Sequence, residues 1–83
     1  MLFRSNRADL VAQYGDTIWI FELKRAKYAT ADDALQQIIN RDYVAPYIEP
    51  GRTLFQIGLA FDDASHHLVD AKVQQFTVPV PVD

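Results

Sequence analysis

A short apolar segment that ends in two opposite charges, residues 17–24, constrains the fold of this chain most. It reads Thr-Ile-Trp-Ile-Phe-Glu-Leu-Lys, and β-branched and aromatic side chains are typical of strands. Alternation along a strand puts Glu22 and Lys24 on the face that carries both isoleucines, and the other face is apolar throughout. Apolar residues on both faces predict a central strand that is covered on both sides. Glu22 and Lys24 come where the apolar residues end, so this strand end is a candidate site.

The preceding segment, residues 7–14, is predicted to form a hairpin with this strand. A two-residue Gly-Asp loop at 15–16 fits a type II′ turn, because glycine adopts the positive φ that this turn requires. That loop length places Asp9 directly opposite Glu22, with their Cβ atoms about 5 Å apart. Like charges in this arrangement are destabilising. We therefore expect either a divalent cation between the carboxylates or the Lys24 ammonium to offset the repulsion.

The 83 residues predict one small domain, with a core over about residues 7–76 and an extended tail at 77–83. A domain of this size buries only roughly 60% of the surface of its unfolded chain. The chain has no cysteine and therefore no disulfide or zinc-thiolate site to stabilise it. Good packing or a partner chain is the remaining source of stability.

The net charge of −3 argues against a protein that coats nucleic acid through bulk electrostatics. A local basic rim is compatible with that charge, and so is an ordinary solvated edge. The residues concerned are Arg4, Arg7, Lys24, Arg25 and Lys27. We find no apolar run long enough to span a membrane and no signal peptide, so we expect a cytoplasmic protein without a membrane partner.

A helix is predicted after the central strand. Thr30 is suited to cap its first N–H groups, and Asp33 occupies the capping-box position. The apolar positions with helical spacing, which we expect to face the sheet, are Ala31, Ala34, Leu35 and Ile38. Gln37 lies on the flank of this apolar face. A short helical turn is predicted over residues 43–47, with Pro46 suited to its opening.

Two further strands are predicted after the helix. Residues 53–61 have the composition of a buried strand, in which Gly58 indicates close approach by another element. Residues 68–76 are predicted to form a half-exposed edge strand with Val69, Ala71 and Val73 facing inward. The element order is therefore ββαββ, an α/β fold in which one main helix covers a mixed sheet. The connection through the helix should join parallel strands, and sites in such sheets lie beyond the carboxyl ends of strands.

This pattern of an acid, a hairpin, a Glu-X-Lys and a glutamine-bearing helix resembles the PD-(D/E)XK nuclease superfamily and its restriction-endonuclease-like core. The closer likeness is to the branch found behind an AAA-ATPase-like domain in bacterial proteins. The stretches that carry the resemblance are residues 7–11, 18–24, 34–38, 43–47 and 57–61. Ala8 replaces the proline of the family name, which is a common departure.

The resemblance implies a role for each residue of the motif. Asp9 and Glu22 correspond to the two acids that bind a divalent metal, Mg²⁺ or Mn²⁺. Lys24 corresponds to the lysine that orients or deprotonates the attacking water. Gln37 matches a glutamine that some branches place beside the site, although a solvent-facing helix residue is an equal alternative. Tyr43 matches a tyrosine that follows it, but we favour core packing with a hydrogen-bonded hydroxyl for this residue.

One departure from the family affects the predicted assembly. The family core usually begins with a helix before the first strand, and only six residues precede Arg7 here. We therefore expect that helix and the ATPase-like domain to be missing, and the face that the helix covers to be exposed or covered by another subunit. A homodimer is the resulting prediction.

Three functions remain open from the sequence. The leading hypothesis is a metal-dependent nuclease that hydrolyses phosphodiester bonds in DNA. The alternatives are a catalytically inactive, nuclease-derived module for dimerisation or interaction, and a structural metal-binding domain without nucleic acid. His66 and His67 are assigned to a polar loop, because neighbours in an extended chain point in opposite directions.

Overall fold

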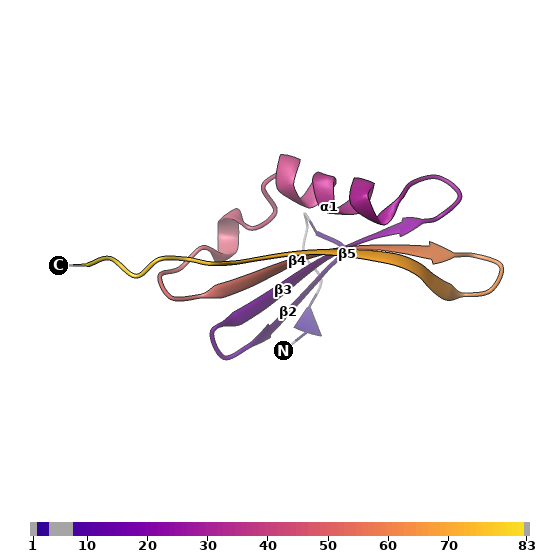
Figure 1. Cartoon of the computed structure of the whole chain (residues 1–83). Helices are drawn as coiled ribbons and strands as arrows, with labels where there is room; N and C mark the ends of the chain where they lie inside the picture. The colour runs from indigo at the N-terminus through magenta and orange to yellow at the C-terminus, as the bar shows by residue number, and fades with distance from the viewer. Residues whose placement is uncertain (1, 4–7, 83) are drawn as a thin grey trace.

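The computed structural model describes residues 2–3 and 8–82, which form one layer of helix on one face of a sheet (Figure 1). The elements in chain order are β1 (Leu2–Phe3), β2 (Leu10–Tyr14), β3 (Thr17–Arg25), α1 (Ala31–Asn40), the 3-10 helix η1 (Ala45–Tyr47), β4 (Thr53–Asp62) and β5 (His67–Thr77). Within residues 2–3 and 8–82, no helix has the length and apolar character needed to cross a bilayer.

The sheet is mixed, and its strand order follows the sequence, β1-β2-β3-β4-β5. Strands β3 and β4 are parallel and are joined through α1, whereas the other neighbouring strands are antiparallel. The predicted α/β fold with order ββαββ is therefore confirmed, and the two-residue β1 adds a strand that the sequence did not indicate. The first predicted strand, residues 7–14, is too long, because β2 begins at Leu10 and Arg7 lies outside the described residues.

The hairpin of β2 and β3 has the predicted register. Tyr14 pairs with Thr17 across the two-residue loop, and Gly15 has a φ of +57°. A positive φ is readily accessible to glycine because it has no Cβ. The loop therefore fixes which side chains of β2 and β3 share a face, and the ladder ends at the pair of Leu10 and Phe21.

Helix α1 begins with the predicted capping box. The Thr30 hydroxyl accepts a hydrogen bond from the Asp33 backbone N–H at 3.0 Å, and the Asp33 carboxylate accepts one from the Thr30 N–H at 2.9 Å. The buried residues of the helix are those predicted from its spacing, Ala31, Ala34, Leu35 and Ile38. The small side chains let the helix approach β4 closely. A Cβ atom on Gly58 would lie 2.5 Å from the Leu35 backbone nitrogen and would also clash with the Ala31 carbonyl oxygen.

The core lies between α1 and one face of the sheet. The fully buried large side chains are Ile18, Ile20, Ile38, Leu54 and Val11. On the opposite face of β3, Trp19 and Phe21 are half-buried and Leu23 is 41% exposed. The prediction that β3 is covered on both sides is therefore wrong for the described residues. Helix α1 connects β3 to β4 and packs on one face of the sheet. It therefore covers only that face of β3.

Strand β4 alternates in the same way. Leu54, Gln56 and Ala60 are buried beneath α1, whereas Phe55 and Ile57 are half-buried on the other face. The sequence reading of a strand with uniformly buried apolar residues overlooked Gln56.

Strand β5 lies at the edge of the sheet, as predicted, but its valines do not face inward. Val69 and Val73 are 60% and 58% exposed. Ala60 pairs with Asp70, but the next residue, Phe61, pairs with Leu68. Val69 is therefore the extra residue of a β-bulge in β5. Bulges re-aim the side chains of the strand that contains them, so Val69 and Val73 do not share a face as simple alternation requires. Beyond the strand, residues 78–82 have no regular structure, although the Val78 N–H donates to the Arg52 carbonyl at 2.8 Å.

The close approach at Gly58 generates a stability prediction. Gly58→Ala should lower the free energy of unfolding by about 1–3 kcal/mol, because the added methyl overlaps helix backbone that cannot move aside as a side chain would. Urea unfolding followed by far-UV circular dichroism measures the change. Gly15→Ala is the control, since no atom lies within 4 Å of its added Cβ and only its φ of +57° is unfavourable. Equal stability of Gly58→Ala and the parent would contradict the proposed packing.

Candidate functional site

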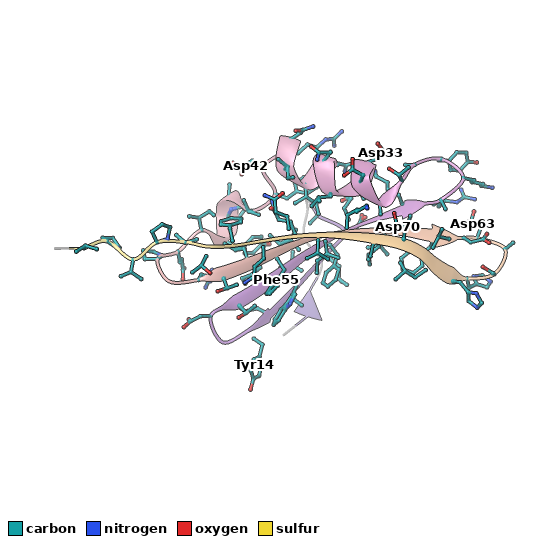
Figure 2. The ribbon with its side chains drawn as sticks, viewed as in Figure 1. Tyr14, Asp33, Asp42, Phe55, Asp63 and Asp70 are labelled. Carbon is teal, nitrogen blue, oxygen red and sulfur yellow. The ribbon has the colours of Figure 1, made fainter. Side chains whose placement is uncertain are left out.

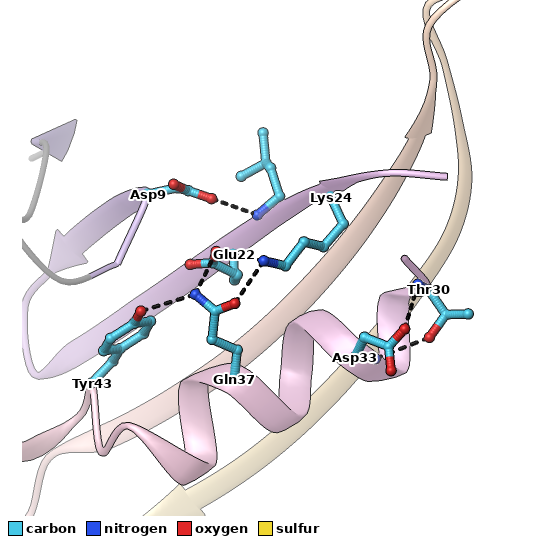
Figure 3. A network of polar contacts seen from close by, with 8 residues as sticks. Asp9, Glu22, Lys24, Thr30, Asp33, Gln37 and Tyr43 are labelled. Carbon is cyan, nitrogen blue, oxygen red and sulfur yellow. Dashed lines mark hydrogen bonds and ion pairs between the residues drawn. The ribbon is translucent and has the colours of Figure 1, made fainter. Parts of the chain in front are cut away.

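The predicted site residues come together at the carboxyl-terminal half of β3, beneath α1 (Figure 3). Asp9 lies just before β2, outside the ladder, so the predicted direct cross-strand pair with Glu22 is not formed. Its Oδ2 instead accepts a hydrogen bond from the Leu23 backbone N–H at 2.8 Å. Because the ladder ends at Leu10 and Phe21, this N–H has no strand partner, and the Asp9 side chain is the group that satisfies it.

Glu22 is a buried carboxylate and is only 5% exposed. Burial raises the pKa of Glu22, the nearby Asp9 charge raises it further, and the Lys24 ammonium partly opposes both effects. The expected repulsion between the two acids is therefore present even though they are not paired in the ladder. Lys24 Nζ lies 3.4 Å from Glu22 Oε2, so the ammonium supplies part of the compensation predicted from the sequence.

Gln37 connects the site residues to one another. Its Oε1 accepts a hydrogen bond from Lys24 Nζ at 2.6 Å, and its Nε2 donates to Glu22 Oε2 at 2.9 Å. An ammonium only donates and a carboxylate only accepts, so these partners fix which end of the amide faces which group. The amide thereby holds the cation and the anion in place, and a solvent-facing role for Gln37 is wrong.

Tyr43 reaches the same amide from the other side. The end of α1 is a Schellman motif, in which the Tyr43 N–H donates to the Ile38 carbonyl and the Asp42 N–H donates to the Ile39 carbonyl, both at 3.1 Å. Asp42 has a φ of +51°, the left-handed conformation that this motif requires. The turn buries the Tyr43 ring and directs its hydroxyl to Gln37 Nε2 at 2.9 Å. The Tyr43 ring thus packs in the core while its hydroxyl accepts a hydrogen bond from Gln37.

The donor set fits a hard divalent cation. Two carboxylates face one region, and Glu22 Oε1 is buried without a hydrogen-bond partner among the described residues. An unsatisfied buried carboxylate oxygen is costly unless a cation or donor reaches it. No group of three or more His, Cys, Asp or Glu side chains gathers within residues 2–3 and 8–82. Mg²⁺ keeps several of its water ligands and commonly binds through one or two carboxylates together with substrate phosphates, so Asp9 and Glu22 are the residues that could hold it.

Lys24, Arg25 and Lys27 are the members of the proposed basic rim that lie within the described part of the chain. Arg25 and Lys27 both contact Asp63, which lies in the turn after β4, and both lie over the Tyr28 ring. The Arg25 guanidinium lowers the pKa of Asp63, consistent with a charge-neutralising contact. Arg4 and Arg7 lie outside the described residues. Arg25 and Lys27 therefore belong to a solvated edge and share one acid, whereas Lys24 contacts Glu22 and Gln37.

Two polar features of this region were not found by sequence reasoning. The Leu23 N–H that fixes Asp9 follows from where the ladder ends, which the sequence does not mark. Gln56 is 4% exposed and its Oε1 is buried without a described partner. Its position between Leu54 and Gly58 on the helix-facing side could have been read from strand alternation.

Comparison with known families identifies the chain's relatives. A family model described as PD-(D/E)XK nuclease superfamily matches residues 4–71. The matched region contains Asp9, Glu22, Lys24 and Gln37. Comparisons with curated proteins and with solved structures gave no match.

The raised pKa of Glu22 predicts a pH-dependent stability difference. The folded state holds the Glu22 proton more tightly than the unfolded chain, whose ordinary pKa is 4.5. Ionisation of Glu22 therefore costs stability as the pH rises through the folded-state pKa, and this cost is absent below pH 4.5. Without divalent cations, the melting temperature of Glu22→Gln should rise relative to the parent between acidic and neutral pH.

Differential scanning fluorimetry across this pH range checks the prediction. Glu49→Gln provides the matched control, because the Glu49 side chain is 66% exposed. If the difference in melting temperature between Glu22→Gln and the parent does not change with pH, burial does not hinder the ionisation of Glu22.

Proposed function

Because the chain belongs to the PD-(D/E)XK nuclease superfamily, we propose that it hydrolyses phosphodiester bonds in DNA with Mg²⁺ or Mn²⁺. The observation that carries this proposal is the buried Glu22 carboxylate, which lies near the Asp9 charge. The Gln37 side chain forms hydrogen bonds to both Glu22 and Lys24 and so links them. The family motif places two acids and one cation near a single phosphate, and Asp9, Glu22 and Lys24 are the matching residues here. The predicted cytoplasmic location stays a prediction.

Asp9 and Glu22 are the proposed metal ligands. A bound divalent cation would activate water and neutralise charge on a phosphate oxygen. Glu22 contributes its free Oε1. Asp9 is exposed and retains one carboxylate oxygen besides the one bonded to the Leu23 N–H. The hydrogen bond to the backbone fixes the orientation of Asp9 before any cation arrives, which reduces the ordering cost of binding.

Lys24 is the proposed catalytic residue that meets the attacking water. Its side chain is 27% exposed, so the ammonium is held by Gln37 yet remains open to solvent on one side. In hydrolysis the water oxygen bonds to phosphorus and the bond to the leaving oxygen breaks. The proton of the attacking water passes to solvent, and the leaving oxygen takes a proton from solvent. An ammonium beside the phosphate stabilises the charge that develops on the phosphoryl oxygens.

Gln37 is a positioning residue in this proposal. It contacts Glu22 and Lys24 but does not need to contact the phosphate. Tyr43 supports it from behind through the hydrogen bond to Nε2. Their effect is to hold the proposed ligand and the proposed catalytic cation at fixed separation.

One observation favours the alternative function, an inactive module for dimerisation or interaction. The sheet face opposite α1 is apolar and half-exposed, which is unusual for a small monomer. We also propose that the chain forms a homodimer. The expected absence of the ATPase-like domain stays a prediction. A structural metal domain without nucleic acid is distinguished from both by the two experiments below.

Divalent cations should stabilise the fold. Saturating Mn²⁺ at about 100 times its dissociation constant raises the free energy of unfolding by about 2.7 kcal/mol when only the folded state binds. Thermal melting in a Mn²⁺ titration measures this effect. Asp9→Asn and Glu22→Gln should abolish it, whereas the exposed Asp16→Asn should keep it. Melting of the parent that does not respond to Mn²⁺ or Mg²⁺ would contradict the metal site.

DNA cleavage should depend on Lys24. In a plasmid nicking assay with Mg²⁺ or Mn²⁺, Lys24→Ala should lower the rate by about 100-fold or more, because the group that orients and stabilises charge is lost. Lys72→Ala is the matched control, since Lys72 is an exposed lysine on the edge strand β5. Nicking that survives in Lys24→Ala would indicate a contaminant or another site. Mn²⁺ binding by a parent that does not nick DNA would support the structural metal-binding domain. Melting that does not respond to metal, in a parent that does not nick DNA, would support the inactive module.

A further inference from the structure

The face of the sheet that α1 leaves uncovered has a uniform apolar centre. Figure 2 shows Phe55 and Tyr14 on the side of the sheet away from the helix. By the strand register, the central residues of this face are Leu10, Ala12, Trp19, Phe21, Leu23, Phe55, Ile57, Leu59, Ala71 and Val73. Trp19 and Phe55 stack on neighbouring strands, with ring centroids 5.9 Å apart. No helix in the described part of the chain packs against this surface, which we call the open face.

The chemistry of the open face selects an apolar partner. None of its central residues carries a charge, and Arg25 at its rim already contacts Asp63. Nucleic acid binding to stacked aromatic side chains is accompanied by cations that neutralise the phosphates. Such cations are missing from the centre of the open face. Its complement is therefore another apolar protein surface.

The dimensions of the open face approach those of a stable protein interface. The five strands have 2, 5, 9, 10 and 11 residues. With strands about 4.8 Å apart and residues rising about 3.3 Å each, the sheet covers roughly 590 Å². Standard specific interfaces bury about 600–1,000 Å² on each partner, so this area lies close to the lower end of that range. Leu23, Leu68 and Val73 on this side are 41%, 52% and 58% exposed, so much of that apolar area faces water in the single chain.

A second copy of the chain meets these requirements. A two-fold contact places the same patch on both subunits, so an uncharged face is complementary to itself without any matching of charges. Two sheets pack face to face at about 10 Å with their strands about 30° apart. We propose that the open face is the surface through which two copies of this chain associate. The proposal is independent of catalysis, because Glu22 and Lys24 share the opposite, helix-facing side of β3.

Substitution of two valines on the same strand tests the proposal. Val73 pairs with Ile57 on the open face, whereas Val69 lines a small pocket with Thr30 and Ala31 on the helix side. Their exposures of 58% and 60% are nearly equal, so an aspartate should perturb the single chain similarly at either position. Val73→Asp should weaken association by about 100-fold, because each subunit would bury an unpaired carboxylate. Val69→Asp should leave association unchanged.

Light scattering coupled to size-exclusion chromatography, at micromolar to millimolar concentration, reads the mass of each protein. We expect a two-chain mass for the parent and Val69→Asp, and a one-chain mass for Val73→Asp. Circular dichroism of all three confirms folding. A one-chain mass for the parent overturns the proposal and leaves the open face to a different occupant. A two-chain mass for Val73→Asp, or dissociation of Val69→Asp, also overturns it by placing the contact elsewhere.

The single tryptophan gives a second readout that does not depend on a variant. Trp19 lies at the centre of the open face and is the one tryptophan of the sequence. Dilution of the parent from above to below the dissociation constant of the dimer should shift the Trp19 fluorescence emission to longer wavelength. It should also increase the quenching of that emission by acrylamide. Val73→Asp should show the dissociated emission at every concentration. A dimer whose Trp19 emission does not change on dilution would overturn the assignment of this face.

Discussion

The contact between the backbone of α1 and Gly58 of β4 sets the spacing on which the site depends. Because Gly58 has no side chain, the Leu35 N–H and the Ala31 carbonyl lie directly on the sheet. At this separation Gln37 is close enough to bond both Glu22 and Lys24. A side chain at position 58 would move the helix outward and lengthen both bonds. Packing and the polar network are therefore consequences of the same small residue.

The polar network compensates for an unfavourable arrangement of charge. Glu22 is buried beside a second acid, and both burial and that acid raise its pKa. Lys24 and Gln37 satisfy one of its oxygens, and the other oxygen has no described partner. A structure that keeps a costly buried carboxylate with one free oxygen has a feature more typical of a binding site than of a core.

The two faces of the sheet have different roles. The helix-facing side holds the core, together with Glu22, Gln37 and Lys24, whereas the other side is apolar and half-exposed. A chain this small has little core from which to gain stability. Burial of the open face would add apolar contact without altering the site, because β3 separates the two surfaces. Substitutions on the open face can therefore change association of the chain without changing the site around Glu22 and Lys24.

The sequence alone determined the local features, because their causes lie within a few residues. The Gly-Asp loop set the hairpin register, Thr30 and Asp33 set the start of α1, and alternation put Glu22 and Lys24 on one face. Tertiary structure decided which face is covered, where the β2 ladder ends and therefore that Asp9 bonds the Leu23 N–H. It also decided the exposure of β5 and the contacts of Gln37. These depend on where a helix distant in sequence packs and on a bulge, and the pattern of apolar residues encodes neither.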